Sequence, residues 1–392
     1  MSTALPEYGG KERSALLRLL SLAGARPVLG APPVDLGLDE HLPYPFMAVV
    51  GQVEMRTALL LAVINPAVGG VLLIGPRGVG KTVAVRSLSS LLPDVLVSNC
   101  AEGCLPEDAR DGGPGLCPEC AEKHARGVPI AHEEPVRLIE LPLNARLEDV
   151  VGGINERIAV QQGRVRLERG ILARADQNLL YVDEVNLLDD TIVDAILDAS
   201  AAGSYTVRRG AMVGTYRSRF VFIGSMNPEE GGLRPQIMDR FGLRVTVRGL
   251  TTPEERLEVY RRVREYRASR RAFIYKWYAV TEAAREEVAA ARELLREVVL
   301  DEQAVELGLG LIRALDIDSH RAEYTMFEAA RAHAAADGRD RATVDDLRAV
   351  AVMSLRQRRS PFMIDFLKAQ GEEDGQILAT LSELHASSQA FR

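Results

Sequence analysis

The stretch of sequence that decides the fold reads Gly75-Pro76-Arg77-Gly78-Val79-Gly80-Lys81-Thr82. It matches the pattern G-x-x-x-x-G-K-[ST] at every position, and it lies between an apolar run at Val71–Ile74 and a helical pattern that begins at Lys81. Glycines let backbone N–H groups turn inward around phosphate groups, and a helix N-terminus adds partial positive charge. A glycine-rich turn before a surface lysine is the alternative, but the flanking strand and helix favour a phosphate-binding loop.

The last two side chains of this loop indicate its ligands. We expect Lys81 to reach the β and γ phosphates of ATP, and Thr82 to hold Mg²⁺ through its hydroxyl oxygen. The backbone of residues 75–80 should wrap around the phosphates. The sequence therefore predicts that residues 75–82 bind ATP together with Mg²⁺.

Short apolar runs on both sides of the loop predict the fold class. Near-continuous apolar runs are typical of a parallel sheet that is covered on both faces, and the amphipathic segments between them suit helices. We therefore predict an α/β domain of three layers over residues 44–250. The expected strands are Val71–Ile74, Leu138–Leu141, Leu179–Val182, Phe220–Gly224 and Val245–Val247, and the expected helices are Lys81–Leu92 and Asp189–Ala202.

The chain after Pro253 has no strand signals and predicts a second, all-helical domain over residues 251–360. Residues 1–43 form an N-terminal extension with a proline-rich stretch, and residues 361–392 form a C-terminal tail. The sequence does not indicate a function for either of these two segments. The expected helices of the second domain are Glu254–Ser269, Thr281–Val299, Gln303–Leu315, Ser319–Ala336 and Thr343–Arg359.

Polar side chains follow two of the predicted strands. Asp183 and Glu184 come directly after Leu179–Val182, at the sheet edge where parallel sheets bind ligands. We expect Asp183 to bind Mg²⁺ through water and Glu184 to polarise the attacking water, although two acids at a strand end can simply be solvated. Asn227 follows another strand and is placed to contact that water or the γ-phosphate. Alone, it would favour a turn before Pro228.

Four cysteines, all of those in the chain, lie between residues 100 and 120. Two close pairs separated by a short, glycine- and proline-rich loop can surround one tetrahedral ion, which predicts structural Zn²⁺ in an insert over residues 98–134. An iron–sulfur cluster, free thiols and a redox switch remain alternatives, and His124 and His132 are spare ligand candidates. The two pairs are Cys100 with Cys104 and Cys117 with Cys120.

Composition narrows the function classes. The 392 residues carry a formal net charge of -7, which argues against a dedicated nucleic-acid binder but leaves a local basic patch open. No apolar run of about 18 residues occurs, and the N-terminus lacks the apolar core of a secretory signal, so we expect a cytoplasmic protein without membrane contact. A basic run of Arg356, Arg358 and Arg359 should be a solvated helix end.

Longer matches around these motifs resemble the AAA+ ATPases, and within them the motor subunit of magnesium chelatase. The resemblance covers roughly residues 44–360 and is more specific than a phosphate loop alone. The cysteine insert is not among the motifs of that family. The matching segments include Tyr44–Phe46, Val49–Gln52, Gly69–Gly75, Gly170–Ala175, Leu180–Leu188, Asn227–Gly231, Leu233–Gln236 and Met238–Leu243.

The resemblance implies roles for three further side chains. Asn227 resembles the sensor-1 residue, Arg240 the arginine finger, and Arg321 the sensor-2 arginine of the helical domain. A guanidinium suits the charge on γ-phosphate oxygens. Pairing of Arg240 with Asp239, and of Arg321 with Glu323, is the alternative for each. Gly152–Arg169 resembles the family's insertion, and Gly203–Arg219 resembles its hairpin.

The resemblance also implies an assembly and a task. A finger that acts in a neighbouring copy requires a ring, and the family suggests a hexamer. It implies two partners, an integrin-like subunit of the von Willebrand type and a large porphyrin-binding subunit, with the ring driving metal insertion into a tetrapyrrole. A cobaltochelatase motor, a MoxR-like chaperone ATPase and a nucleic-acid helicase are the alternatives. The acidic balance counts against the helicase.

Overall fold

The computed structural model describes residues 43–100, 102–110, 115–154, 167–210, 212–359, 370 and 372–380. Nearly all of the predicted N-terminal extension lies outside the described residues. So do most of the predicted tail and residues 155–166 of the predicted insertion. None of the described helices is both long enough and apolar enough to cross a membrane.

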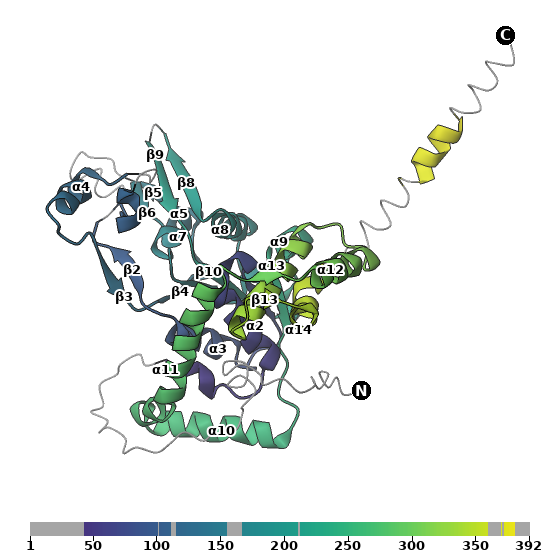
Figure 1. Cartoon of the computed structure of the whole chain (residues 1–392), viewed down its shortest axis with the longest axis horizontal. Coiled ribbons are helices and arrows are strands. Elements are labelled where there is room, and N and C mark those ends of the chain that lie inside the picture. The colour runs from purple at the N-terminus through teal and green to yellow at the C-terminus, as the bar shows by residue number, and fades with distance from the viewer. Residues whose placement is uncertain are drawn as a thin grey trace, which may run out of the picture.

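A five-stranded parallel sheet forms the centre of the first domain (Figure 1). Its order is β11-β1-β10-β7-β4, and every neighbouring pair is parallel. All five predicted strands are present, with shifts of a few residues at some ends. The strands are β1 (Val71–Ile74), β4 (Leu138–Glu140), β7 (Leu179–Val182), β10 (Val221–Met226) and β11 (Leu243–Thr246).

Successive side chains of the strands enter two separate cores, as the alternation of a strand requires. In β1, Val71 and Leu73 belong to one core, whereas Leu72 and Ile74 belong to the other. The first core includes α2 (Val53–Ile64) and the second includes α8 (Asp190–Ala202). Both faces of the sheet are therefore covered, which confirms the three-layer α/β prediction.

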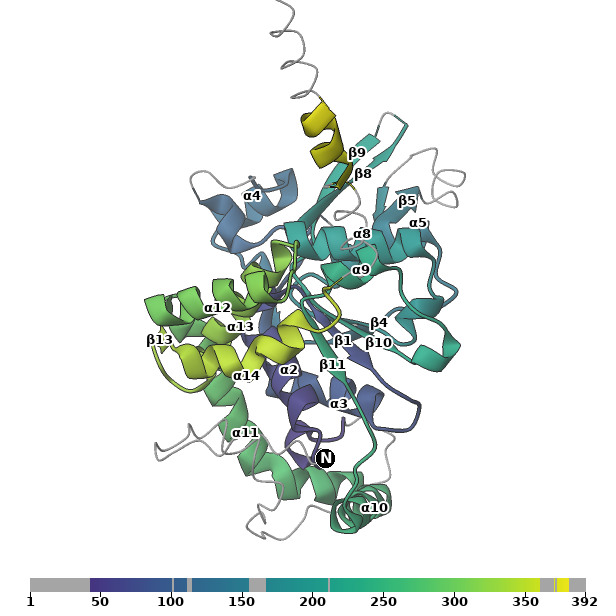
Figure 2. The ribbon, with the colours of Figure 1, turned by 90° about the vertical axis from the view of Figure 1, so that its right-hand side faces the viewer.

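The second domain is helical, as predicted. Figure 2 shows α12, α13 and α14 grouped beside the sheet, and α13 and α14 pack against each other. Some boundaries were wrong: α11 begins at Arg270, where Ser269 caps it, rather than at Thr281, and it ends at Leu294 rather than at Val299. α14 ends at Leu355 rather than at Arg359. The helices are α10 (Pro253–Ala268), α11 (Arg270–Leu294), α12 (Glu302–Ala314), α13 (Arg321–Ala336) and α14 (Val344–Leu355). A short parallel pair joins β12 (Val299–Leu300) to β13 (Arg341–Ala342).

A buried arginine fastens the end of the helical domain to the α/β domain. The guanidinium of Arg358 donates to the carboxylate of Asp239 at 2.9 Å and to the carbonyl oxygen of Gly242 at 3.1 Å. Arg356 donates to Glu54 at 2.7 Å. The expectation that this basic run is solvated was therefore wrong for both residues, because carbonyl and carboxylate groups of the α/β domain meet it there. Arg359 alone of the three is exposed.

Three smaller pairs of strands project from the sheet. The cysteine segment lies between β2 (Val95–Ser98) and β3 (Ala131–Glu134), which pair antiparallel and frame a turn at Pro106–Ala109 and the helix α4 (Pro118–Ala125). β5 (Gly152–Ile154) pairs with β6 (Leu167–Arg169). The predicted hairpin is confirmed as β8 (Ser204–Arg209) and β9 (Met212–Arg217), and Figure 1 shows it standing out from the body above α8.

Candidate functional site

The phosphate loop joins the end of β1 to the start of α3 (Lys81–Leu88), as the sequence predicted. Gly75 is required at the first turn, because a Cβ there would lie 2.1 Å from the carbonyl oxygen of Val247. The Lys81 side chain turns back over the loop, donating to the carbonyl oxygens of Gly75 and, at 2.9 Å, Pro76. Burial lowers the pKa of Lys81, and Asp183, Glu184 and Glu230 act against that shift.

The two predicted Mg²⁺ ligands lie close together. The hydroxyl oxygen of Thr82 is 3.4 Å from a carboxylate oxygen of Asp183. Hard oxygen donors of this kind, one hydroxyl and one carboxylate beside a phosphate loop, suit Mg²⁺. This donor set fits the ion that the sequence predicted.

Two residues that the sequence analysis did not single out hold Asp183 in place. The hydroxyl of Tyr181 donates to the Asp183 carboxylate at 2.9 Å, and the hydroxyl of Ser225 donates to the same oxygen. Burial raises the pKa of Tyr181 to about 12, so its proton stays available for this bond. Tyr181 shares a strand face with Asp183, and Ser225 lies at the end of the adjacent strand β10. Strand alternation could have indicated Tyr181, whereas Ser225 depends on the strand order.

Glu184 lies at the carboxyl end of the sheet with an unusual backbone. Its φ is 53°, in the left-handed region, and its N–H donates to the Ser225 hydroxyl at 3.3 Å. Its carboxylate accepts from Arg77 of the phosphate loop at 2.7 Å, and Arg77 also contacts Glu230 at 2.6 Å. The hydrogen bond to Glu184 raises the pKa of Arg77. Glu184 therefore faces the phosphate loop, as a residue that acts on the γ-phosphate must.

Asn227 follows β10 and is 4% exposed. Because β10 pairs with β7, it lies at the same sheet edge as Asp183 and Glu184. Its side-chain oxygen accepts the N–H of Glu229 at 3.3 Å, which is the turn role weighed from the sequence. The turn fixes the orientation of the amide at this edge, so the turn role and a sensor role are compatible.

Among the ion pairs of the described residues, neither predicted arginine contacts the phosphate loop of its own chain. Arg240 ends α9 (Pro235–Arg240) and pairs with Asp194 at 3.1 Å and Asp198 at 2.8 Å, both on α8. Arg321 begins α13, is 54% exposed and lies 3.8 Å from Asp239. Neither makes the pairing that was weighed as its alternative. The Arg240 side chain remains 28% exposed beside these two acids.

The four cysteine sulfurs form a compact group, all within 4.8 Å of one another. Backbone N–H groups point at three of them: those of Cys104, Cys117 and Cys120 lie 3.4, 3.3 and 3.5 Å from the sulfurs of Cys100, Cys104 and Cys117. Burial raises the pKa of Cys100, but hydrogen bonds from Ser98 and Cys104 outweigh it and lower that pKa to about 6. The ring nitrogens of His132 are bonded to Asn99 and Glu134 instead.

The chain combines a complete phosphate loop after β1, two acids at the end of β7 and a helical lid. This combination defines an AAA+ ATPase. A family model described as an AAA lid domain matches residues 310–380, and one described as magnesium chelatase, subunit ChlI, matches residues 45–104. A putative ATPase from Cytophaga hutchinsonii shares the fold at 20% identity and a TM-score of 0.52, covering 79% of this chain and 83% of that one.

Curated relatives define the family more closely. A magnesium-chelatase subunit ChlI homolog from Methanocaldococcus jannaschii is 42% identical over 81% of this chain and 87% of its own length. The magnesium-chelatase 38 kDa subunit of Acidiphilium rubrum is 42% identical over 80% of this chain and 90% of its own length. A chain in the cryo-EM complex of the magnesium chelatase subunits BchI and BchD is 38% identical, with a TM-score of 0.47, and covers 81% of this chain and 97% of that one. The chain belongs to the ChlI family of magnesium chelatase ATPase subunits.

Proposed function

We propose that this protein is the ATP-hydrolysing motor of a magnesium chelatase, which couples ATP turnover to insertion of Mg²⁺ into a tetrapyrrole. The observation that carries the proposal is identity of 42% over about four fifths of the chain to relatives of that name, together with an intact hydrolytic site. Since the chain spans 87% or more of those two relatives, its architecture matches theirs almost throughout.

The arrangement of the site supports a separate role in ATP hydrolysis for each of its side chains. The phosphate loop and Lys81 bind the phosphates, while Thr82 and Asp183 would hold Mg²⁺, which would neutralise charge on the phosphate oxygens. Tyr181 and Ser225 keep the Asp183 carboxylate aimed at that position. Glu184 accepts a proton from the attacking water, and Asn227 orients that water. The whole set lies at the carboxyl ends of β1, β7 and β10, so the strand order brings it together.

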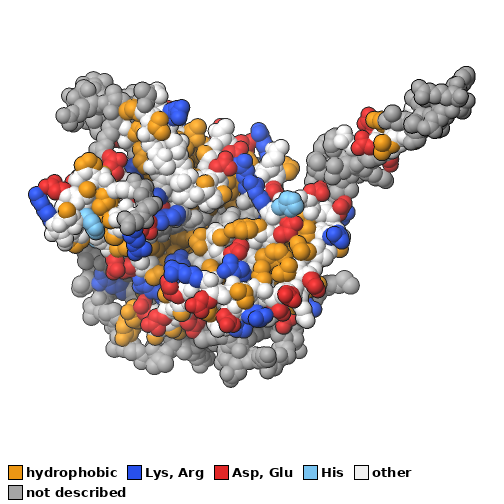
Figure 3. Space-filling model, turned by 45° about the horizontal axis from the view of Figure 1, so that its top comes forward, with side chains coloured by type: hydrophobic (Ala, Val, Ile, Leu, Met, Phe, Trp, Pro, Cys, Tyr) orange, Lys and Arg blue, Asp and Glu red, His pale blue; other side chains and the backbone are white. Residues whose placement is uncertain are grey.

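The assembly proposed for this motor is a homo-oligomeric ring, and by family analogy a hexamer, in which Arg240 of one copy reaches the ATP of the next and Arg321 responds to nucleotide from the lid. Its partners are an integrin-like, von Willebrand-type chelatase subunit and a large porphyrin-binding subunit. The complex of the magnesium chelatase subunits BchI and BchD shows a second chelatase subunit bound to a related protein. On the face shown in Figure 3, basic and acidic side chains are interspersed, which does not favour a nucleic-acid track on that face.

Reconstitution tests the proposal. The purified chain is mixed with its two candidate partner subunits, a porphyrin, ATP and either Mg²⁺ or Co²⁺, and formation of the metalloporphyrin is followed by fluorescence and absorbance. We expect Mg²⁺ insertion that requires both this chain and ATP hydrolysis. Insertion of Co²⁺ but not of Mg²⁺ would favour a cobaltochelatase function. ATP hydrolysis with no insertion of either metal, or ATPase stimulated by DNA, would reject the chelatase function in favour of a remodelling or helicase role.

We also propose that Cys100, Cys104, Cys117 and Cys120 bind one structural Zn²⁺. A tetrahedral ion at about 2.3 Å from each sulfur places the sulfurs about 3.8 Å apart, which the compact group accommodates. The N–H groups that point at the sulfurs stabilise thiolates, as outer hydrogen bonds do in metal sites. The four cysteines are unpaired, which agrees with a cytoplasmic location where thiols stay reduced.

Metal analysis of the purified protein checks this site. We expect one zinc per chain, lost in the double variant Cys117→Ser/Cys120→Ser. A visible absorption spectrum distinguishes the iron–sulfur alternative, since thiolate-bound zinc is colourless and iron–sulfur clusters are not. Protein that carries no metal after purification and takes up none from added Zn²⁺ would leave the cysteines as free thiols.

A further inference from the structure

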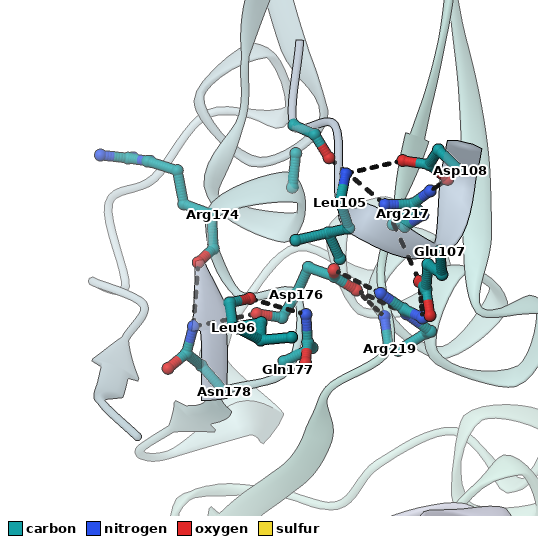
Figure 4. A network of polar contacts seen from close by, with 12 residues as sticks. Leu96, Leu105, Glu107, Asp108, Arg174, Asp176, Gln177, Asn178, Arg217 and Arg219 are labelled. Atoms are coloured by element: carbon teal, nitrogen blue, oxygen red, sulfur yellow. Dashed lines mark hydrogen bonds and ion pairs between the residues drawn. The ribbon is translucent and has the colours of Figure 1, made fainter. Parts of the chain in front are cut away.

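The described residues of the segment that carries the cysteines, 100, 102–110 and 115–120, are here called the cysteine knuckle, and the turn Pro106–Ala109 carries its ion pairs to other parts of the chain (Figure 4). Asp108 on that turn is 4% exposed and accepts from the guanidinium of Arg217, which lies at the end of β9. Its other oxygen accepts the N–H of Leu105 at 2.7 Å. Arg217 also donates to the carbonyl oxygen of Gly103 at 3.3 Å. Arg217 therefore connects the cysteine knuckle to the β8–β9 hairpin.

The same turn is also tied to the base of the central sheet. Glu107 pairs with Arg219 at 2.8 Å, and Arg219 pairs with Asp176 at 3.1 Å (Figure 4). Arg219 stands just before β10 and Asp176 just before β7. These two strands carry Asp183, Glu184 and Asn227 at their other ends. One turn of the knuckle therefore joins the hairpin to the two strands that carry the hydrolytic side chains.

The knuckle also approaches the β5–β6 pair, since Gly103 and Arg169 line the same pocket. Gly103 has a φ of +78°, and a Cβ on it would lie 3.0 Å from the guanidinium of Arg169 at the end of β6. Arg169 is itself fixed by donating to the carbonyl oxygen of Ala173 at 3.0 Å. Glycine is favoured at this place because the backbone lies in the left-handed region, and any side chain would also require Arg169 to move.

The packing between the knuckle and the sheet is incomplete, although Leu105 is buried there. A cavity of about 640 Å³ lies between them, lined by Leu96 and Leu105 on one side and by Arg137 and Asn178 on the other. The knuckle's own apolar cluster is separate from both cores of the molecule and consists of the four cysteines with Leu116 and Ile130. A cluster that small orders little chain without a metal or a disulfide. Its shape depends on what the cysteines bind.

We propose that the metal-held cysteine knuckle is a strut, which fixes the β8–β9 hairpin and the β5–β6 pair relative to the bases of β7 and β10. This inference rests on the proposed zinc site. The ion holds the two cysteine pairs together. This holds Asp108 against Arg217, Glu107 against Arg219 and Gly103 near Arg169. Removal of the ion frees the turn, and the hairpin loses its fixed position while the phosphate loop keeps its own.

Hydrogen–deuterium exchange measured by mass spectrometry tests the strut on the full chain, without partner subunits. Chelation of the zinc is expected to give about tenfold faster exchange in residues 102–110 and in β9, as the loss of charge-assisted hydrogen bonds predicts, with no change in peptides of the phosphate loop. Arg217→Gln should reproduce the change in β9 with one zinc still bound and with unaltered basal ATPase. Arg208→Gln, an exposed arginine on the same hairpin, is the matched control.

Each outcome has a distinct meaning. If zinc is bound but exchange in the hairpin changes neither on chelation nor in Arg217→Gln, the strut proposal is wrong and the zinc site is still supported. A protein that binds no metal would overturn both. Because exchange is read without a porphyrin or partner subunits, failure of the chelatase assay would not be mistaken for either result.

Discussion

Replacement of Glu184 by glutamine is expected to lower kcat for ATP hydrolysis by about 10²–10⁴-fold, with ATP still bound. The amide keeps the size of the side chain and can still accept from Arg77, but it cannot take a proton from water. Lys81, Thr82 and Asp183, which we propose to hold the phosphates and Mg²⁺, are unchanged in this variant. Steady-state ATPase and binding of a fluorescent ATP analogue measure the two effects separately.

The control for this variant is Glu229→Gln, which removes an exposed carboxylate a few residues beyond Asn227. It should hydrolyse ATP at the wild-type rate. If Glu184→Gln kept more than about a tenth of wild-type kcat, Glu184 would not be the proton acceptor. The neighbouring acid in the ion pair with Arg77, Glu230, would then be the residue to replace next.

Replacement of Arg240 by alanine is expected to cost about 10³–10⁵-fold in kcat, the range found for arginine fingers. Within one chain Arg240 pairs with two acids of α8 and has no contact with the phosphate loop among its described ion pairs. The expected loss therefore arises at the neighbouring subunit. The matched control is Arg234→Ala, at the N-terminal end of the same helix, where an exposed pair with Asp190 contributes little.

Mixing decides whether the arginine acts between subunits. Neither Arg240→Ala nor Glu184→Gln should hydrolyse ATP alone, but a mixture should recover part of the activity, since some interfaces combine an intact Glu184 with an intact Arg240. Full activity of Arg240→Ala alone would remove the finger assignment and the main support for the ring. Recovery that fails although gel filtration shows mixed oligomers would place Arg240 in its own subunit's site.

Much of the active site could be predicted because its signals are local. The phosphate loop is one continuous motif, and Asp183 and Glu184 follow directly on the strand that places them. The five strands were readable since a parallel sheet covered on both faces needs continuous apolar runs. The predicted start of α11 at Thr281 was wrong, although Phe273 and Trp277 are spaced about one helical turn apart and are both buried on α11.

The loop, the strands, the two acids after β7 and the compact cysteine motif could all be predicted, since each depends on residues that are neighbours along the chain. Which strands adjoin depends on long-range packing, and so does the convergence of Tyr181 and Ser225 on Asp183. The tertiary structure alone buried Arg358 and set Asp108 against Arg217, which lie 109 residues apart. The physical reason is that a buried ion pair is specified by two surfaces brought together in folding. Neither surface leaves a periodic pattern in its own segment.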